Sequence, residues 1–239
     1  MRIDILTIFP SLINSFVNES LIGKAQESGT LEISALDIRE GASGVHKAVD
    51  DTPFGGGPGM VLKPDPIFNV VENKKPPRPL YLLSPAGEPF SHSKAKELSK
   101  LDGFSLLCGR YEGVDQRVRD HLIDGEISLG DFVLAGGEIA ALAIVETVTR
   151  LIPGVMGNIE SAASESFTQG LLEYPQYTRP WDFEGLTPPD ILRSGNHEEI
   201  ELWRKAKALE ITLSNRPDLI EKRGGLTDQE QSLLERKFT

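Results

Sequence analysis

The chain has 239 residues, of which 39% are hydrophobic and 26% are charged, and its net charge is −11. This composition is that of a soluble globular protein with one or two domains, and it excludes strong non-specific attraction to nucleic acid. A single cysteine, Cys108, excludes an internal disulfide and any zinc site built from several cysteines. Charge alone neither supports nor excludes specific binding to RNA.

The first two-thirds of the chain alternate between strand and helix patterns. Residues 3–9 form a short apolar run, residues 11–28 have the amphipathic spacing of a helix that ends at Gly29, and residues 31–38 alternate apolar with polar. Further helices are expected at 65–75, 91–101, 114–123 and 138–152, and further strands at 79–85, 104–109 and 125–133. This alternation, with nearly continuous apolar strands, predicts an α/β fold with a parallel sheet.

The apolar helix expected at 138–152 does not have the character of a membrane span. Asp131, Glu138, Glu146 and Arg150 interrupt the surrounding sequence, so no run of about 18 apolar residues exists. The N-terminus lacks the basic-then-apolar pattern of a signal peptide. We therefore expect a cytoplasmic protein that does not associate with membranes.

The character of the sequence changes after about residue 156. A small, polar stretch is typical of a linker, and three helix starts follow: Thr187 before two prolines, Asn196 with Glu199, and Thr227 with Glu230. The predicted division is an α/β domain at 1–156, a linker at 157–169 and a small all-helical domain at 170–239.

A glycine-rich segment, DDTPFGGGPGM, occupies residues 50–60. A dinucleotide-binding fingerprint needs a strand before the glycines and a helix after them, whereas Asp-Asp-Thr-Pro precedes them here. No Gly-Lys-Ser/Thr follows, so a phosphate-binding P-loop is excluded. A flexible surface loop and a lid that approaches a ligand closely both remain open.

Three predicted strands end in turns that contain glycine: SPAG (84–87), LLCGRYEGVDQRV (106–118) and SLGDFVLAGGE (128–138). Ligands of parallel α/β sheets bind beyond the carboxyl ends of the strands, so these turns predict one pocket made of backbone N–H and C=O groups. Without a lysine, such a pocket suits a neutral or cationic adenosyl ligand better than a triphosphate. The charges at 110–117 are equally typical of a salt-bridged helix start, and Cys108 is expected to be a core thiol.

The motifs DDTPFGGGPGM, LLCGRYEGVDQRV, SLGDFVLAGGE, TRLIPGV and YTRPWDFEG…PPDILRSGNHEEIELWR resemble, in the same order, the bacterial tRNA guanine-N1 methyltransferase family. The resemblance implies a knotted (SPOUT) enzyme dependent on S-adenosylmethionine, with a deep trefoil knot between about Ser84 and Gly137, although chains in general avoid knots. It also implies that the knot loops hold the cofactor. The implied cofactor-binding residues are Leu83, Ser84, Pro85, Gly109, Ser128, Leu129, Gly130, Asp131, Phe132, Val133, Leu134, Gly136 and Gly137.

The same resemblance implies the reaction and its partners. Family members are homodimers with active sites between the subunits, and they methylate N1 of the guanine 3′ of the tRNA anticodon rather than any DNA. Arg150 matches the arginine that meets guanine O6, and Glu165 in SESF stands where the family has an aspartate as general base. Glu112 matches an acidic residue linked to Mg²⁺ dependence, although one carboxylate is a weak metal signal.

Three other functions remain open from the sequence. A related knotted methyltransferase could act on another RNA, although the tail SGNHEEIELWR argues against this. A silent RNA-binding relative would result if glutamate at position 165 abolished turnover. An NTP-binding α/β protein is disfavoured because no lysine motif is present.

Overall fold

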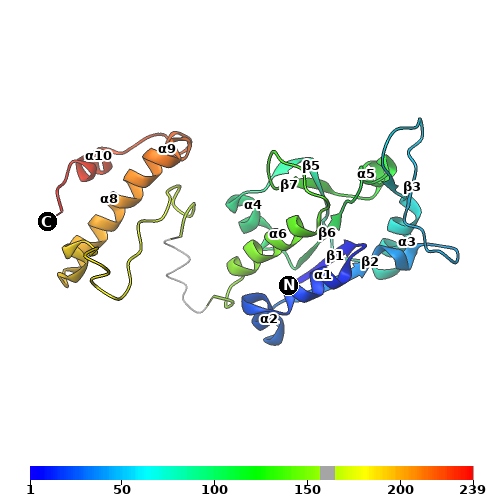
Figure 1. Ribbon diagram of the computed structural model, residues 1–239, viewed down its shortest axis with the longest axis horizontal. Helices are drawn as coiled ribbons and strands as arrows, with labels where there is room; N and C mark the ends of the chain where they lie inside the picture. The colour runs from blue at the N-terminus through cyan, green and yellow to red at the C-terminus, as the bar shows by residue number, and fades with distance from the viewer. Residues whose placement is uncertain (157–164, 239) are drawn as a thin grey trace. The chain divides into compact units, whose positions relative to one another are not determined.

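The computed structural model describes residues 1–156 and 165–238, which belong to two compact units, Met1–Gly157 and Asn158–Thr239. The first unit is built on a five-stranded sheet of order β2-β1-β6-β5-β7 in which every neighbouring pair is parallel (Figure 1). This confirms the predicted parallel α/β architecture. Its strands are β1 (Arg2–Thr7), β2 (Glu32–Asp37), β5 (Leu80–Pro89), β6 (Gly103–Cys108) and β7 (Gly125–Ser128).

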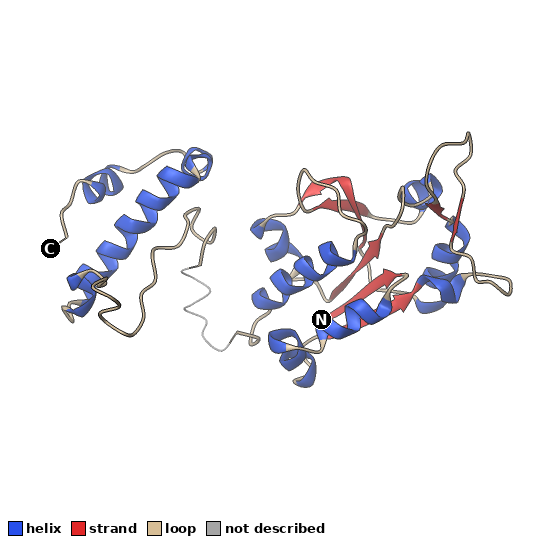
Figure 2. Cartoon of the chain, viewed as in Figure 1, coloured by secondary structure: helices blue, strands red, loops and turns tan. Residues whose placement is uncertain are grey.

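Successive side chains of the central strands enter two different hydrophobic clusters. Ile5 of β1 and Leu106 of β6 belong to one cluster, whereas Leu6 and Leu107 belong to the other, as the two-residue period of a strand requires. Helices cover both faces of the sheet (Figure 2). The first face packs against α1 (Pro10–Val17), α2 (Ser20–Glu27), α4 (His92–Leu98) and α6 (Glu138–Leu151), and the second against the 3₁₀ turn η1 (Ile38–Gly41), α3 (Pro64–Lys74) and α5 (Gln116–His121).

The prediction of a single helix over 11–28 is wrong, because two helices, α1 and α2, occupy this segment. The backbone turns at Ser20, whose φ is +54°. Gln26 donates from Nε2 to the carbonyl of Val17 at 2.7 Å and so satisfies a group at the end of α1. Both helices bury residues in the same cluster, so one amphipathic period runs through the break. Gly29, with φ +73°, follows α2 as predicted.

The strand predicted over 125–133 ends at Ser128, and a loop follows it. Gly130 adopts a φ of +150°, which side-chain-bearing residues rarely adopt, and its N–H donates to Ser128 Oγ at 3.2 Å. Phe132 and Val133 are 54% and 86% exposed. The apolar residues that suggested a strand therefore belong to the loop that leads into α6.

The glycine-rich segment is the exposed tip of a hairpin formed by β3 (Asp50–Asp51) and β4 (Val61–Leu62). At the tip, Phe54 is 97% exposed. The base of the hairpin is bonded to the segment after β6, because Leu62 N donates to Gly113 O and Asp115 N donates to Leu62 O, both at 3.0 Å. The loop is therefore anchored beside one of the predicted ligand-binding turns.

In the second unit the described helical elements are the 3₁₀ turn η2 (Asp190–Arg193), α8 (His197–Asn215), α9 (Pro217–Lys222) and α10 (Asp228–Leu234). Residues 170–189, which were predicted to belong to an all-helical domain, contain no helix. Leu209 of α8, Ile220 of α9 and Leu233 of α10 share one buried cluster. None of the helices in the described part of the chain is both long enough and apolar enough to cross a bilayer.

Two of the three predicted helix starts in this unit are confirmed. Asn196 accepts a hydrogen bond from Glu199 N at 3.3 Å, and Thr227 forms a complete capping box with Glu230. The start predicted at Thr187 is wrong, because the turn η2 begins only at Asp190, with Pro189 as its N-cap. A proline disfavours helical backbone in the residue before it, which delays the start when two prolines are adjacent.

Candidate functional site

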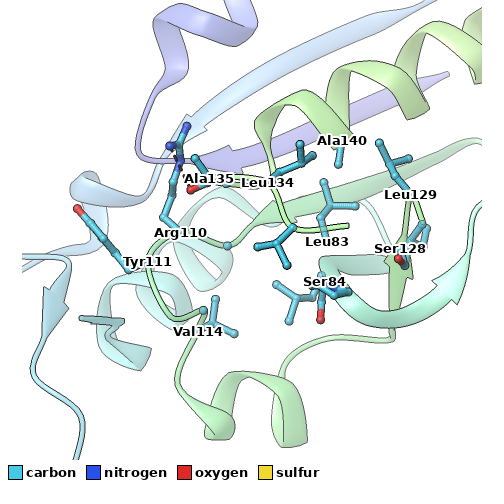
Figure 3. A pocket seen from close by; sticks show the side chains of 18 of the residues that line it. Leu83, Ser84, Arg110, Tyr111, Val114, Ser128, Leu129, Leu134, Ala135 and Ala140 are labelled. Atoms are coloured by element: carbon cyan, nitrogen blue, oxygen red, sulfur yellow. Dashed lines mark hydrogen bonds between the residues drawn. The ribbon is translucent and has the colours of Figure 1, made fainter. Parts of the chain in front are cut away.

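A pocket of about 260 Å³ lies where β5, β6 and β7 end (Figure 3). Ser84 lies within β5, just after the pairing of β5 with β6 ends at Leu83, Gly109 follows β6, and Ser128 is the last residue of β7. These three segments meet at the carboxyl edge of the sheet. Ala140, in the first turn of α6, closes one side of the pocket.

The structure brings the expected cofactor-binding residues together in this pocket, with one exception. Asp131 is not among the lining residues, whereas its neighbours Gly130 and Phe132 are. The pocket is also lined by residues that were not named as cofactor-binding, although several of them lie in the turns predicted to form it: Leu82, Arg110, Tyr111, Glu112, Gly113, Val114, Arg119, Ile127, Ala135 and Ala140.

The pocket wall offers backbone groups and apolar side chains rather than free positive charge. Ser84 Oγ accepts hydrogen bonds from Ala86 N at 3.1 Å and from Arg119 Nη2 at 3.4 Å. Arg119 is in turn neutralised by both carboxylate oxygens of Glu126, at 2.8 and 2.9 Å. A wall of this kind does not attract a polyphosphate, and it accommodates a ligand that is neutral or cationic.

Close backbone contact between two of the turns explains the adjacent glycines. Gly137 N donates to Gly109 O at 2.9 Å. A Cβ on Gly137 would lie 2.8 Å from the Cα of Cys108, and a Cβ on Gly136 would collide with the Arg110 side chain. At Gly137, where the close atoms are backbone, only glycine allows the loop before α6 to lie against the exit of β6, whereas a larger residue at Gly136 would require Arg110 to move.

The charged residues after β6 have separate roles. Asp115 caps α5 and pairs with Arg117 through two 2.8 Å contacts, and these hydrogen bonds lower the pKa of Asp115. This is the salt-bridged helix start that the spacing allowed. Cys108 is buried, as predicted, and burial raises the pKa of its thiol well above the ordinary value.

Buried polar residues beside the pocket were not identified from the sequence. Glu138 is fully buried; it accepts a hydrogen bond from Thr7 Oγ1 at 2.7 Å and one from Arg110 Nε at 2.9 Å. A glutamate at the first position of a helix is also favoured by the helix dipole alone, so its type and place carried no specific signal. Thr7 lies far away in the sequence and gave none.

A magnesium site at Glu112 finds no support in the described residues. No group of three or more His, Cys, Asp or Glu side chains within 1–156 and 165–238 could hold a metal ion. The Glu112 side chain lies instead against Gly59 of the hairpin loop. The residues present therefore do not fit a metal ion held by the protein at this point.

The two expected catalytic residues lie in different units. Arg150 is exposed in the last turn of α6, about ten residues beyond Ala140, which corresponds to about 15 Å along the helix. Glu165 is half-buried in the second unit, where it lines a cavity of about 530 Å³ with Tyr174 and Arg204. Neither residue lines the pocket at the sheet edge.

The parallel sheet and the glycine-rich pocket at its carboxyl edge define an α/β protein whose candidate ligand site lies where such sheets bind their ligands. The model of the family described as tRNA (Guanine-1)-methyltransferase TrmD matches residues 1–222, and the chain belongs to this family. Proteins described as tRNA (guanine-N(1)-)-methyltransferase in Staphylococcus aureus strains JH9 and Mu50 are each 50% identical to it over 238 residues. The match covers 99% of this chain and 97% of each relative.

Proposed function

We propose that the protein methylates N1 of the guanine that follows the anticodon of tRNA, with S-adenosylmethionine as the methyl donor. The observation that carries this proposal is the pocket in which three glycine-containing strand exits meet, in a chain of the tRNA (guanine-1)-methyltransferase family. S-adenosylmethionine supplies an electrophilic methyl group on a sulfonium. The expected cofactor residues other than Asp131 would hold it.

The character of the pocket fits such a donor. Its wall combines apolar side chains such as Leu83 and Leu134 with the backbone of Gly109, and the charge of Arg119 is already neutralised by Glu126. The apolar surface suits a purine ring, and backbone carbonyls tolerate a sulfonium. A triphosphate would lack a positive partner here.

Methyl transfer to guanine N1 requires a base, because N1 carries a weakly acidic proton. Until this proton is removed, N1 is a poor nucleophile. We assign proton removal to the Glu165 carboxylate, and we assign Arg150 to guanine O6, where negative charge gathers as the proton leaves. Glutamate is one methylene longer than the aspartate of the family pattern. The backbone at position 165 would therefore lie slightly farther from guanine N1, or the Glu165 side chain would adopt a more folded rotamer.

The distance between Arg150 and the pocket supports a dimeric active site. Arg150 lies at the opposite end of α6 from the pocket of its own chain, so a second subunit would bring an Arg150 and a Glu165 to that pocket. Apolar side chains available for a subunit contact include Phe16 of α1 and Ile139 of α6, which are 40% and 55% exposed.

The pairing of β5 with β7 supports the expected trefoil knot. Leu83 and Glu88 of β5 both pair with Ile127 of β7, so residues 84–87 leave the ladder and return to it. Gly87 lies so close to the backbone of Ile127 that an added Cβ would collide with it. Such an excursion is what a knot loop between about Ser84 and Gly137 needs.

The target guanine would have to leave the stacked anticodon loop to reach the pocket. We assign contacts with the RNA to the hairpin loop at 52–60 and to Asn196, His197, Arg204 and Lys205 of the second unit. The predicted boundaries at 156 and 169 separate these two parts. Arg204 already contacts Glu201 and Lys205 contacts Glu230, so their attraction for phosphate would be moderate.

A methyl-transfer assay tests the proposal. Purified protein and labelled S-adenosylmethionine are combined with tRNA transcripts that differ only in the base 3′ of the anticodon. Transfer to the guanine transcript alone is the expected result. Transfer only to ribosomal RNA would favour the related enzyme on another RNA, and tRNA binding without any transfer would favour the silent relative.

A further inference from the structure

The carboxylate of Glu138 lies at the junction of three segments beside the pocket. It is at the start of α6, and it accepts hydrogen bonds from Thr7 at the end of β1 and from Arg110 after β6. Thr7 Oγ1 also accepts from Phe9 N at 2.9 Å, which fixes the chain between β1 and α1. Burying a carboxylate fully costs free energy unless the carboxylate is paired and hydrogen-bonded. Glu138 is fully buried, and each of its two oxygens accepts a hydrogen bond.

Arg110 extends this network across two of the pocket turns. Its Nε binds Glu138, and its Nη1 donates to the carbonyl of Ala135 at 3.3 Å. Its guanidinium also lies 4.5 Å from the centre of the Phe9 ring. Figure 3 shows Arg110 with its guanidinium beside Ala135, at the edge of the pocket. One side chain thus joins the turn after β6 to the loop before α6.

The position of this pair distinguishes it from an ordinary structural ion pair. Arg110, Ala135 and Gly136 all line the pocket, whereas Glu138 contributes no lining surface of its own. A shift of the Arg110 side chain would release Ala135 and the close contact at Gly136 together. The backbone already joins these two turns, because Gly137 N donates to Gly109 O at 2.9 Å and Arg110 pairs with Gly136 in an isolated β-bridge. The Glu138–Arg110 pair adds a side-chain connection that fixes where Ala135 lies relative to the turn after β6.

We propose that Glu138 is a positioning residue for the cofactor pocket, acting through Arg110 to hold two of its three turns at the spacing that the ligand needs. The proposal rests on the proposed function, because it takes the ligand to be S-adenosylmethionine. Glu138 itself would touch neither the cofactor nor the guanine. Its contribution would appear as affinity, because a preorganised pocket avoids the cost of ordering its loops on binding.

Calorimetric titration of the full-length protein with S-adenosylhomocysteine tests this. Glu138→Gln keeps the size of the side chain, but Thr7 and Arg110 donate to different carboxylate oxygens, and the amide nitrogen that replaces one of these oxygens cannot accept a hydrogen bond. We expect the Kd of the folded protein to rise about tenfold, and the KM for S-adenosylmethionine to rise while kcat at saturating cofactor changes less.

Asp4→Asn is the matched control. Asp4 is also a fully buried carboxylate of the same sheet and pairs with Arg2 at 2.6 Å, but it does not line the pocket. We expect it to leave the Kd within about twofold of wild type. An unchanged Kd in folded Glu138→Gln, or an equal rise in Asp4→Asn, would overturn the proposal.

If the Glu138→Gln variant does not fold, Arg110→Lys tests the same role of the Glu138–Arg110 pair. Lysine keeps a positive charge opposite Glu138, but its single ammonium cannot bind Glu138 and Ala135 in the way that the guanidinium does. A similar rise in Kd supports the proposal, and an unchanged Kd contradicts it. If the wild-type protein itself does not bind S-adenosylhomocysteine, the proposed function fails instead.

Discussion

At the scale of single residues, the resemblance places Glu165 where the family has an aspartate, and a glutamate would preserve the chemistry that the proposed proton removal from guanine N1 requires. A carboxylate one methylene longer still accepts a proton. Glu165→Gln keeps the size and removes the basicity, so we expect the single-turnover rate of methyl transfer to fall by about 10²- to 10⁴-fold. Rapid-quench measurement with saturating tRNA and cofactor checks this.

Two further variants complete that experiment. Glu165→Asp restores the family residue and should retain a rate well above that of the glutamine variant. Glu235→Gln removes an exposed carboxylate at the end of α10 and should leave the rate unchanged. Cofactor affinity should be the same in all of them. A wild-type rate in Glu165→Gln would contradict the assigned role.

Gly87 illustrates a residue whose importance is steric. An added Cβ would meet the backbone of Glu126 and Ile127 rather than a movable side chain. Gly87→Ala should therefore lower the free energy of unfolding by about 2 kcal/mol or more, as overpacking does elsewhere. Ala86→Ser, at an exposed neighbour, should change it by less than about 0.5 kcal/mol. Urea unfolding measures the stability of both variants. Equal stability would contradict the close approach of Gly87 to the backbone of β7.

The pocket shows which residues sequence reasoning can reach. Ser84 and Gly109 each come directly after an apolar run, Ser128 opens a turn that contains glycine, and parallel topology brings such positions to one edge, so local patterns are sufficient to find them. Thr7 and Glu138 meet across 131 positions in sequence. A contact of that kind depends on tertiary packing, and it produces no periodic pattern in the local sequence from which it could be predicted.

At the scale of secondary-structure elements, predictions were correct where the local pattern decides the structure and incorrect where tertiary packing decides it. β6 was predicted closely because all six of its residues are buried and most of them are apolar, with Ser105 as the polar exception. The helix over 11–28 was predicted as one because α1 and α2 pack on the same face, so the apolar period continues through their break. The loop after β7 is apolar although it is exposed, which the pattern of a strand cannot distinguish.

The short helices of the second unit depend on carboxylates that carry lowered pKa values. The Arg216 guanidinium lowers the pKa of Asp218 to about 2. Burial works to raise the pKa of Glu230, but hydrogen bonds from the Thr227 backbone and from Arg223 outweigh it, and the pKa is lowered overall. A lowered folded-state pKa contributes stability above the unfolded value, and that stability is lost as pH falls through the folded value.

Acid should therefore destabilise this unit between about pH 4.5 and pH 2. Both tryptophans, Trp181 and Trp203, lie in the second unit, so their fluorescence during urea unfolding reports on it. The urea midpoint should fall through this range, and Glu230→Gln should reduce the dependence. Glu235→Gln should leave it unchanged, and a midpoint independent of pH would contradict the argument.

At the scale of the whole molecule, the two units divide the proposed reaction between them. The first contains the cofactor pocket and Arg150, and the second contains Glu165 and the basic residues of α8. Arg150 lies about 15 Å along α6 from the pocket of its own chain. This separation is the physical reason for assigning the active site to two subunits, and mixed dimers provide the test.

Glu165→Gln leaves the pocket intact, whereas Gly109→Val places a branched side chain at a pocket-lining position where a Cβ itself meets nothing closer than 3.7 Å. Each homodimer should be inactive. A mixed dimer would combine the intact pocket of one chain with the Glu165 of the other, so random reassociation should restore about a quarter of wild-type activity. Methyl transfer after the two variants are unfolded together and refolded measures this recovery. No recovery, although mixed dimers are present, would mean that Glu165 serves the pocket of its own chain.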